Sequence, residues 1–226
     1  MNTNIKYAFF DLDETVVSFK TMFNFLQFFY IYTDKDNGLE IYDKYMDQLK
    51  IDWQNDKSRE LINREYYHLF SGVDSEVFST IITKWYDYSR KMKGDKFYIN
   101  PVIIELKKLI KNNTKIVFVS GSIYELANLI AKNLNVDHVL ATKIEKINNV
   151  LTGEIIPPQT IGAGKAIAVN SFMQANNISP QDCIAYGDHI SDFEMLKSVG
   201  AGVLVSKDQK TISAAKSYNW KIINDF

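Results

Sequence analysis

The residues most able to do chemistry in this sequence stand in short polar clusters, each directly after an apolar run. The first cluster is residues 11–15 (DLDET), which follow an apolar run at residues 5–10. Phosphoryl transfer needs a nucleophile, a proton donor and a cation. Asp11 and Asp13 can supply the first two if the chain bends after a strand. The alternative is that Asp13 or Thr15 caps the next helix.

Two further clusters contain groups that bind phosphate. Ser120 and Gly121 follow the apolar run 116–119, and a hydroxyl with backbone N–H groups at a helix start can bind a phosphate oxygen. A serine cap on the next helix is the alternative. Lys165 opens an expected helix, where its charge is unfavourable unless an anion lies nearby. The sequence around it does not have the P-loop spacing, so an ATP-binding loop is not expected.

The fourth cluster, residues 187–192 (GDHISD), contains two more carboxylates. Asp188 follows an expected strand and Asp192 lies four residues further on. Mg²⁺ prefers oxygen ligands, and Asp188 together with Asp11 can provide two of them. His189 lies in the same loop, but no Cys/His spacing supports zinc. We therefore interpret His189 as a loop residue near the site.

The pattern around these clusters predicts an α/β fold. Expected strands alternate with expected helices, which indicates a parallel sheet whose ligands bind beyond the carboxyl ends of its strands. The strands are expected at 5–10, 115–119, 139–145, 150–155, 184–186, 202–205 and 220–223, and the helices at 101–111, 122–134, 165–176, 192–198 and 208–216. Between 19 and 93, aromatic residues recur at helical spacing and predict about four helices. Helix packing explains these aromatic residues best, and a ligand-stacking surface is the alternative.

Composition narrows the class of protein. The 226 residues include 26 Lys+Arg and 27 Asp+Glu, a net charge of −1, so no basic excess indicates a nucleic-acid partner. No apolar run is long enough to span a bilayer, and no signal peptide is expected. A membrane partner is therefore not expected either. Cys183, the single cysteine, is expected to be buried. We predict a cytoplasmic protein, with an oligomeric state that the sequence leaves unknown.

Taken in order, these clusters resemble the four motifs of the haloacid dehalogenase superfamily. The resemblance covers residues 5–17 and 97–226. A helical insert between the first and second motifs is similar to the phosphoserine phosphatase-like subclass. The resemblance implies a Rossmann-like, doubly wound parallel sheet core (1–17 plus 97–226) and an inserted α-helical cap (18–96).

The resemblance also implies a role for each motif residue. Asp11 would attack phosphorus and form an aspartyl phosphate, while Asp13 would protonate the leaving alcohol and then activate water. Ser120, with Gly121, would bind the phosphoryl group, and Lys165 would neutralise charge. The reaction would be hydrolysis of a small phosphate monoester.

The same resemblance implies a magnesium cofactor. Asp11 and Asp188 would bind Mg²⁺ directly, and Asp192 directly or through water. The backbone carbonyl of Asp13 would be a further ligand. Mg²⁺ and a lysine would offset the repulsion between a carboxylate nucleophile and an anionic phosphate.

Two departures from the phosphoserine phosphatase pattern bear on the substrate. Lys20 stands where those enzymes are expected to carry a glutamate that binds the substrate's amino group, and Ser191 where an asparagine is expected. A cation at position 20 would repel an ammonium group, so phosphoserine is not the expected substrate. Arginines of the insert are candidate anion contacts, Arg64 among them, together with Arg59 and Arg90. The alternative for all three arginines is that they lie on solvated helix faces and contact no substrate.

Three other functions fit some of these residues. A phospho-accepting signalling domain uses similar groups, but its expected chain is about half as long and lacks the insert. A non-catalytic binding protein on this fold would be expected to lose a chemical residue, and none is lost. A phosphotransferase would use the same aspartyl phosphate with an alcohol in place of water, and would need a cap that excludes water.

Overall fold

The fold is described from a computed structural model, which describes residues 5–226. Its centre is a seven-stranded sheet in the order β4-β3-β2-β1-β5-β6-β7. All neighbouring strands are parallel except β3 and β4, which form an antiparallel pair. The predicted α/β fold with a mostly parallel sheet is therefore confirmed. The strands are β1 (Tyr7–Asp11), β2 (Lys115–Ile123), β3 (His138–Ile147), β4 (Val150–Ile156), β5 (Cys183–Gly187), β6 (Ala201–Val205) and β7 (Lys221–Ile223).

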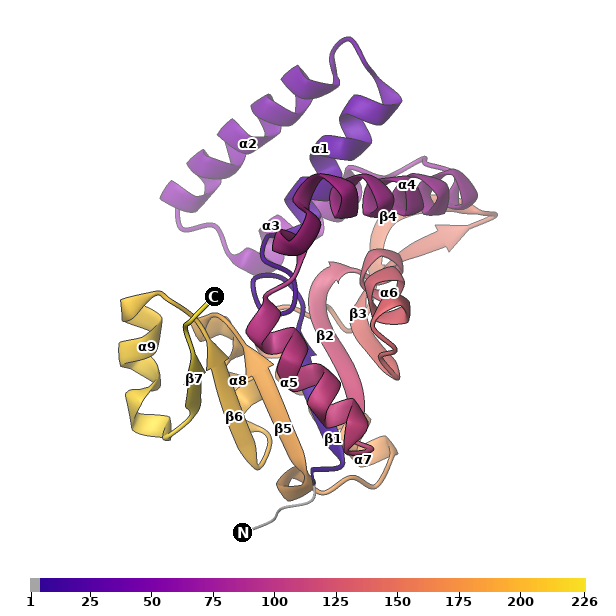
Figure 1. The fold of residues 1–226 in the computed structure, drawn as a ribbon. Coiled ribbons are helices and arrows are strands. Elements are labelled where there is room, and N and C mark those ends of the chain that lie inside the picture. Colours follow the sequence, from indigo (N-terminus) through magenta and orange to yellow (C-terminus); the bar gives the residue numbers. More distant parts are fainter. Residues whose placement is uncertain (1–4) are drawn as a thin grey trace.

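Helices cover both faces of this sheet (Figure 1). Alternate strand residues point to opposite faces, so Phe10 and Phe118 pack with α5 and α6, whereas Phe9 and Val117 pack with α7, α8 and α9. Burial on both faces explains why the strands read as continuous apolar runs. The helices are α5 (Asn100–Lys111), α6 (Tyr124–Asn133), α7 (Ala163–Ala175), α8 (Phe193–Lys197) and α9 (Gln209–Ala215). Short 3₁₀ turns lie at η1 (Gly94–Phe97), η2 (Pro180–Asp182), η3 (Ile190–Asp192) and η4 (Lys216–Tyr218).

Four helices between β1 and α5 lie beyond the carboxyl ends of the central strands, and we call them the cap (Figure 1). They are α1 (Thr21–Thr33), α2 (Gly38–Gln54), α3 (Arg59–His68) and α4 (Ser75–Lys93). Most of their aromatic residues pack inside the cap: the ring of Phe25 lies 5.8 Å from Phe70, 5.5 Å from Phe78 and 5.9 Å from Trp85. Helix packing therefore explains most of the aromatic pattern.

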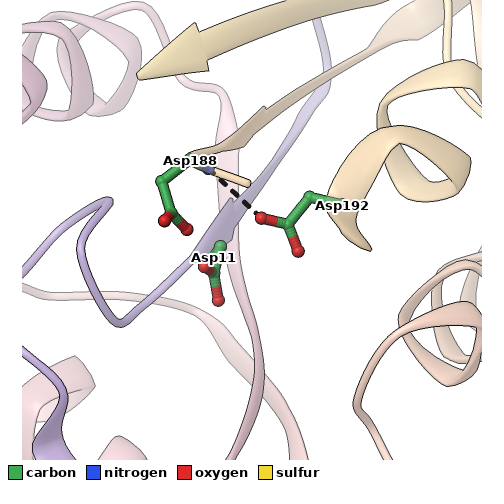
Figure 2. A group of neighbouring side chains, drawn as sticks. All are labelled: Asp11, Asp188 and Asp192. Atoms are coloured by element: carbon green, nitrogen blue, oxygen red, sulfur yellow. Dashed lines mark hydrogen bonds between the residues drawn. The ribbon is translucent and has the colours of Figure 1, made fainter. Parts of the chain in front are cut away.

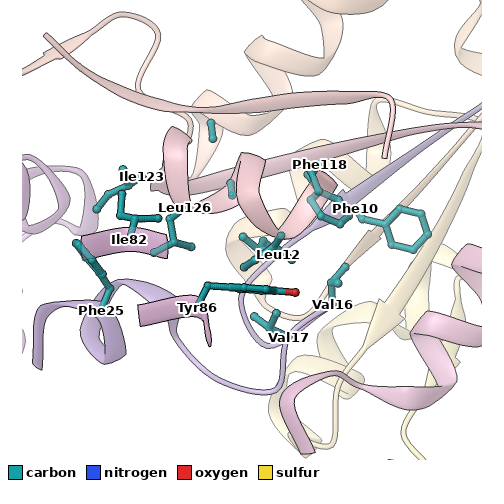
Figure 3. Close-up of a cluster of buried hydrophobic side chains, with 14 of the residues drawn as sticks. Phe10, Leu12, Val16, Val17, Phe25, Ile82, Tyr86, Phe118, Ile123 and Leu126 are labelled. Atoms are coloured by element: carbon teal, nitrogen blue, oxygen red, sulfur yellow. The ribbon is translucent and has the colours of Figure 1, made fainter. Parts of the chain in front are cut away.

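Apolar side chains join the cap to the sheet. Leu12 and Val17, just after β1, lie beside Tyr86 of α4 in a buried cluster that also includes Leu126 of α6 (Figure 3). The β3–β4 hairpin adds backbone bonds to the cap, from Gly72 N to Leu151 O and from Leu151 N to Val73 O, both 2.8 Å. These contacts fix the cap over the strand ends.

The predicted division into a core and a cap at residues 18 and 96 stays a prediction. Residues 1–4 of its first segment lie outside the described residues. Within residues 5–226, no helix combines the length and apolar character needed to cross a membrane.

Candidate active site

The strand ends bring the four sequence clusters to one place. β1 ends at Asp11. Of its two neighbours in the sheet, β2 contains Ser120 near its carboxyl end, and β5 leads into Asp188. Lys165 comes from the first turn of α7. These side chains line one cavity of about 360 Å³, whose other side is lined by residues of the cap. A parallel sheet places its binding site at this edge.

Three carboxylates form the acidic floor of this cavity (Figure 2). One oxygen of each of Asp11, Asp188 and Asp192 lies within 4.8 Å of the others. Asp192 Oδ2 also accepts the backbone N–H groups of Asp188 and His189, at 3.2 Å each. The loop after β5 is thereby folded so that two of its carboxylates face the end of β1.

Lys165 is the cation that faces this floor. Its Nζ lies 2.6 Å from Asp11 Oδ1 and 2.7 Å from Asp192 Oδ1, and all three side chains are buried. Burial alone would lower the pKa of Lys165, but the two carboxylates outweigh burial and raise it. The lysine thus stays charged, and its carboxylate partners explain why a cation is tolerated near the start of a helix.

One lysine does not balance three carboxylates, and their pKa values reflect the excess negative charge. Burial, followed by repulsion from Asp11 and Asp192, raises the pKa of Asp188 to about 9. Burial also raises the pKa of Asp11, against the opposing effect of Lys165. Asp192 differs: burial acts to raise its pKa, but Lys165 brings it below the usual value. An oxygen-only cluster with excess negative charge fits a hard divalent cation such as Mg²⁺.

Asp13 lies beside this cluster but has its own partner in the cap. Its Oδ1 accepts the hydroxyl of Thr21 at 2.6 Å, and the Thr21 oxygen lies 2.9 Å from the Ser122 hydroxyl. Burial raises the pKa of Asp13 to about 7, against the lowering effect of the Thr21 hydrogen bond. A carboxyl group with this pKa can both give and take a proton near neutrality. The N-cap residue of α1 is Lys20, which makes no side-chain capping bond.

The last part of β2, at Ser120 and Gly121, is held from the cap. The Gly121 carbonyl accepts Asn63 Nδ2 at 3.0 Å and the Tyr67 hydroxyl at 2.6 Å. Ser120 Oγ accepts the backbone N–H of Ser122 at 3.0 Å. The helix that follows, α6, begins at Tyr124, and its N-cap residue Ile123 makes no side-chain capping bond. The alternative that a serine caps this helix is therefore wrong.

The predicted substrate contacts of the cap divide into two groups. Lys20 lines the cavity, where its Nζ pairs with Glu14 Oε2 at 2.5 Å. Arg64 is exposed and is not among the residues that line the cavity. Arg59, on the same helix, does line the cavity, whereas Arg90 lies over the rings of Phe97 and Tyr98.

His189 contacts Arg59 at the cavity's rim. Arg59 Nη1 lies 2.9 Å from His189 Nδ1 and 3.0 Å from Ser191 Oγ. The same Nδ1 accepts the backbone N–H of Ser191 at 3.1 Å. Burial, then the charge of Arg59, lowers the pKa of His189. A neutral imidazole that accepts at Nδ1 satisfies these contacts, so His189 positions Arg59 and the loop.

Sequence reasoning missed the cap residues that hold the site, namely Thr21, Asn63 and Tyr67. They belong to helices with no recognisable motif, and a threonine, an asparagine and a tyrosine are ordinary on helices. The spacing of Tyr67 within an aromatic stripe indicated burial but not its hydroxyl contact.

A parallel α/β sheet with an acidic cluster and a lysine at its strand ends is the arrangement expected of a haloacid dehalogenase-type enzyme. The sequence matches the family described as haloacid dehalogenase-like hydrolase over residues 8–197. The chain belongs to this family of hydrolases. The predicted family is therefore confirmed, and with it the prediction that the chain is an enzyme.

Known relatives point to one branch of the family. SerB1, a phosphoserine phosphatase of Mycobacterium tuberculosis, is 33% identical over 104 residues, which cover 46% of this chain and 34% of that protein. The chain spans about a third of the length of the first curated relatives it matches.

Solved structures share the fold at low sequence identity. A Bordetella pertussis protein described as of unknown function has a TM-score of 0.83 at 17% identity, covering 97% of this chain and 98% of that one. A substrate-bound phosphoserine phosphatase has a TM-score of 0.67 at 18% identity, covering 96% and 92%. The predicted likeness to the phosphoserine phosphatase-like branch is thus borne out by sequence and by fold.

Proposed function

We propose that this protein is a Mg²⁺-dependent phosphatase that hydrolyses a small phosphate monoester through an aspartyl phosphate on Asp11. One observation carries the proposal. Asp11 lies 2.6 Å from a buried lysine and within an acidic cluster suited to a divalent cation, while Asp13, with a pKa of about 7, stands beside it. Nucleophile, charge partner and proton donor are thus in one cavity.

The first step transfers the phosphoryl group to the enzyme. A carboxylate oxygen of Asp11 attacks phosphorus, and the bond between phosphorus and the ester oxygen breaks. Asp13 gives its proton to that oxygen, which leaves as an alcohol. Ser120 and Lys165 stabilise the negative charge on the phosphoryl oxygens during the transfer.

The second step returns the enzyme to its starting state. Asp13, now a carboxylate, takes a proton from water, and the water oxygen bonds to phosphorus. The bond between phosphorus and Asp11 breaks, so inorganic phosphate leaves and Asp11 is again a carboxylate. A group with a pKa near neutrality suits both proton transfers.

Magnesium would be held by Asp11 and Asp188, by Asp192 directly or through water, and by the backbone carbonyl of Asp13. When bound, it would supply positive charge that lets an anionic ester approach an anionic nucleophile. The carboxylate set supports this assignment because its charge exceeds that of Lys165.

We further propose that phosphoserine is not the substrate. Phosphoserine carries an ammonium group, which needs a carboxylate partner. The acidic residues that line the cavity are Asp11, Asp13, Asp188 and Asp192, all assigned to the chemistry. Lys20 also lines the cavity and would repel an ammonium group, whereas it would attract a carboxylate or a second phosphate.

Phosphate release from a panel of monoesters tests this function. The panel includes phosphoserine, sugar phosphates, nucleotides and simple alkyl phosphates, with and without Mg²⁺. Asp11→Asn is the matched control, because it keeps the shape of the side chain and removes the nucleophile. We expect Mg²⁺-dependent release that Asp11→Asn abolishes. Release from no ester, with Mg²⁺ bound to a folded protein, would overturn the proposal in favour of transfer to an alcohol or of a binding role.

A further inference from the structure

The cavity has two chemically different sides. The acidic floor, Lys165 and Ser120 lie at the strand ends. The opposite side comes from the insert, where Lys20, Arg59 and Asn63 are polar. Its apolar part is formed by Met22 and Phe23 of α1, Trp53 of α2, and Ile62 and Tyr66 of α3. We call these five residues the aromatic wall. An ester whose phosphate reaches Asp11 must place its alcohol part near this wall.

Two aromatic rings of the wall face the cavity instead of the cap's interior. Phe25, two residues after Phe23, is fully buried in the cap, whereas Phe23 is only partly buried. Trp53 lines the cavity and is 47% exposed. The rings of Phe23 and Trp53 meet edge to face at 6.3 Å and 78°. Exposed aromatic residues are common singly, but two in contact at a cavity over a reactive centre offer a surface to a ligand.

The wall is tied to the last part of β2, whose Ser120 would bind phosphate. Tyr66 donates its hydroxyl to the Met22 carbonyl at 2.8 Å, so the Tyr66 hydroxyl is already used within the wall. Asn63 Nδ2 lies 3.5 Å from Met22 Sδ and donates to the Gly121 carbonyl at 3.0 Å. Gln159 Nε2 donates a hydrogen bond to the oxygen of the same side chain, Asn63 Oδ1, at 2.9 Å. These bonds connect the Met22 and Tyr66 part of the wall to Gly121, beside Ser120.

A wall of this composition selects by shape and apolar surface. Its side chains present rings, a thioether and an aliphatic chain, and a planar apolar group matches them best because aromatic rings pack edge to face or offset on one another. We propose that the alcohol part of the substrate carries an aromatic ring that packs against Phe23 and Trp53. This inference rests on the proposed phosphatase function.

Two esters of similar chemical reactivity test the proposal. 2-Phenylethyl phosphate and propyl phosphate are both esters of unactivated primary alcohols, so their difference reports the ring and not the leaving group. We expect kcat/KM to be about tenfold higher for the phenylethyl ester, as a ring contact worth about 1.4 kcal/mol would give.

Variants then assign the preference to the wall. We expect Trp53→Ala to remove most of the preference. Ile51→Ala is the matched control: Ile51 is on the same helix, is 49% exposed and is not among the residues that line the cavity. It should leave the preference unchanged. Equal kcat/KM for the two esters in the native protein, or a preference that Trp53→Ala leaves intact, would overturn the proposal.

A binding measurement separates this inference from the phosphatase function. 2-Phenylethylphosphonate and propylphosphonate resemble the esters but cannot be hydrolysed at an ester bond. Calorimetry on the native protein with Mg²⁺ should show about tenfold tighter binding of the phenylethyl compound. If no ester, including the whole panel above, is hydrolysed but this difference is found, the proposed function fails and the aromatic wall stands. If the esters are hydrolysed and the phosphonates bind equally, the wall proposal fails alone.

Discussion

Thr21, the first residue of the cap's first helix, donates its hydroxyl to Asp13 at 2.6 Å. The Thr21 oxygen lies 2.9 Å from the Ser122 hydroxyl at the end of β2. Thr21 has one proton to give, so Ser122 donates to Thr21 when Thr21 donates to Asp13. Asp13, the proposed acid and base, is thus held by a hydrogen-bond chain that joins the cap to the sheet.

Removing this hydrogen bond should shift the pH dependence of the reaction. The bond stabilises the charged form of Asp13 and lowers its pKa, so Thr21→Val should raise the pKa from about 7. Asp13 must be protonated to release the alcohol, so the loss of kcat/KM at high pH should move to higher pH. Thr21→Ser keeps the hydroxyl and should keep the native profile. Identical profiles for the valine variant and the native protein would show that Thr21 does not tune Asp13.

Lys165 is expected to be essential for both stability and activity. Lys165→Met leaves Asp11 and Asp192 buried without their cation, which should reduce the free energy of unfolding by about 3–5 kcal/mol. The rate should fall by more than about 100-fold, since charge stabilisation of the phosphoryl group is lost. Urea unfolding and phosphate release measure the two effects.

The matched control for this lysine is an exposed ion pair. Lys44 pairs with Glu40 on the surface of α2, with exposed fractions of 75% and 67%. Lys44→Met should change stability by less than about 1 kcal/mol and leave the rate as it is. Equal effects of the two substitutions would contradict the role given to Lys165.

Magnesium should stabilise the protein more at high pH than at low pH. The pKa of Asp188 is raised from 3.8 to about 9, so the folded metal-free protein holds a proton that the unfolded chain releases. Stability without metal is therefore expected to fall as pH rises between about 4 and 9. Magnesium replaces this proton, so its effect on Tm should be larger at pH 8 than at pH 5.

Thermal unfolding with Mg²⁺, and with Na⁺ at equal ionic strength, measures this effect. Asp188→Asn should reduce both the pH dependence and the response to Mg²⁺, because the amide neither titrates nor carries charge. A Tm shift that is the same at both pH values would count against metal binding by the acidic floor.

Reversing the charge at position 20 should change which esters are preferred. Lys20 lines the cavity, so Lys20→Glu exchanges repulsion of an ammonium group for attraction. The ratio of kcat/KM for phosphoserine to that for propyl phosphate should rise about tenfold, with Lys20→Gln in between. No change in this ratio would mean that Lys20 does not face the alcohol part of the substrate.

The core and its motif residues were predictable because strong local patterns coincide there. Apolar runs buried on both sides identify parallel strands, and polar clusters directly after such runs must meet at one edge of the sheet. Asp11, Ser120 and Asp188 therefore came together as expected. The positions of Lys165 and Asp192 followed from the helices and loops next to those strands.

The cap's side of the cavity was not predictable, because it depends on how three helices face one another. Arg59 and Arg64 lie on the same helix, yet five residues at 3.6 residues per turn separate their directions by about 140°. Only Arg59 lines the cavity. Periodicity identified the aromatic residues of the cap as packing residues, which holds for Phe25 and Trp85, but it could not show that Trp53 faces the cavity.

Chemical trapping of the phosphorylated residue tests the central claim most directly. The protein is mixed with Mg²⁺ and its best ester, quenched in acid and treated with borohydride, which reduces an aspartyl phosphate to homoserine. Mass spectrometry of the digested protein then locates the change. The proposed mechanism predicts homoserine at position 11, dependent on ester and Mg²⁺. Phosphate release without any change at Asp11, or with the change at another aspartate, would contradict it.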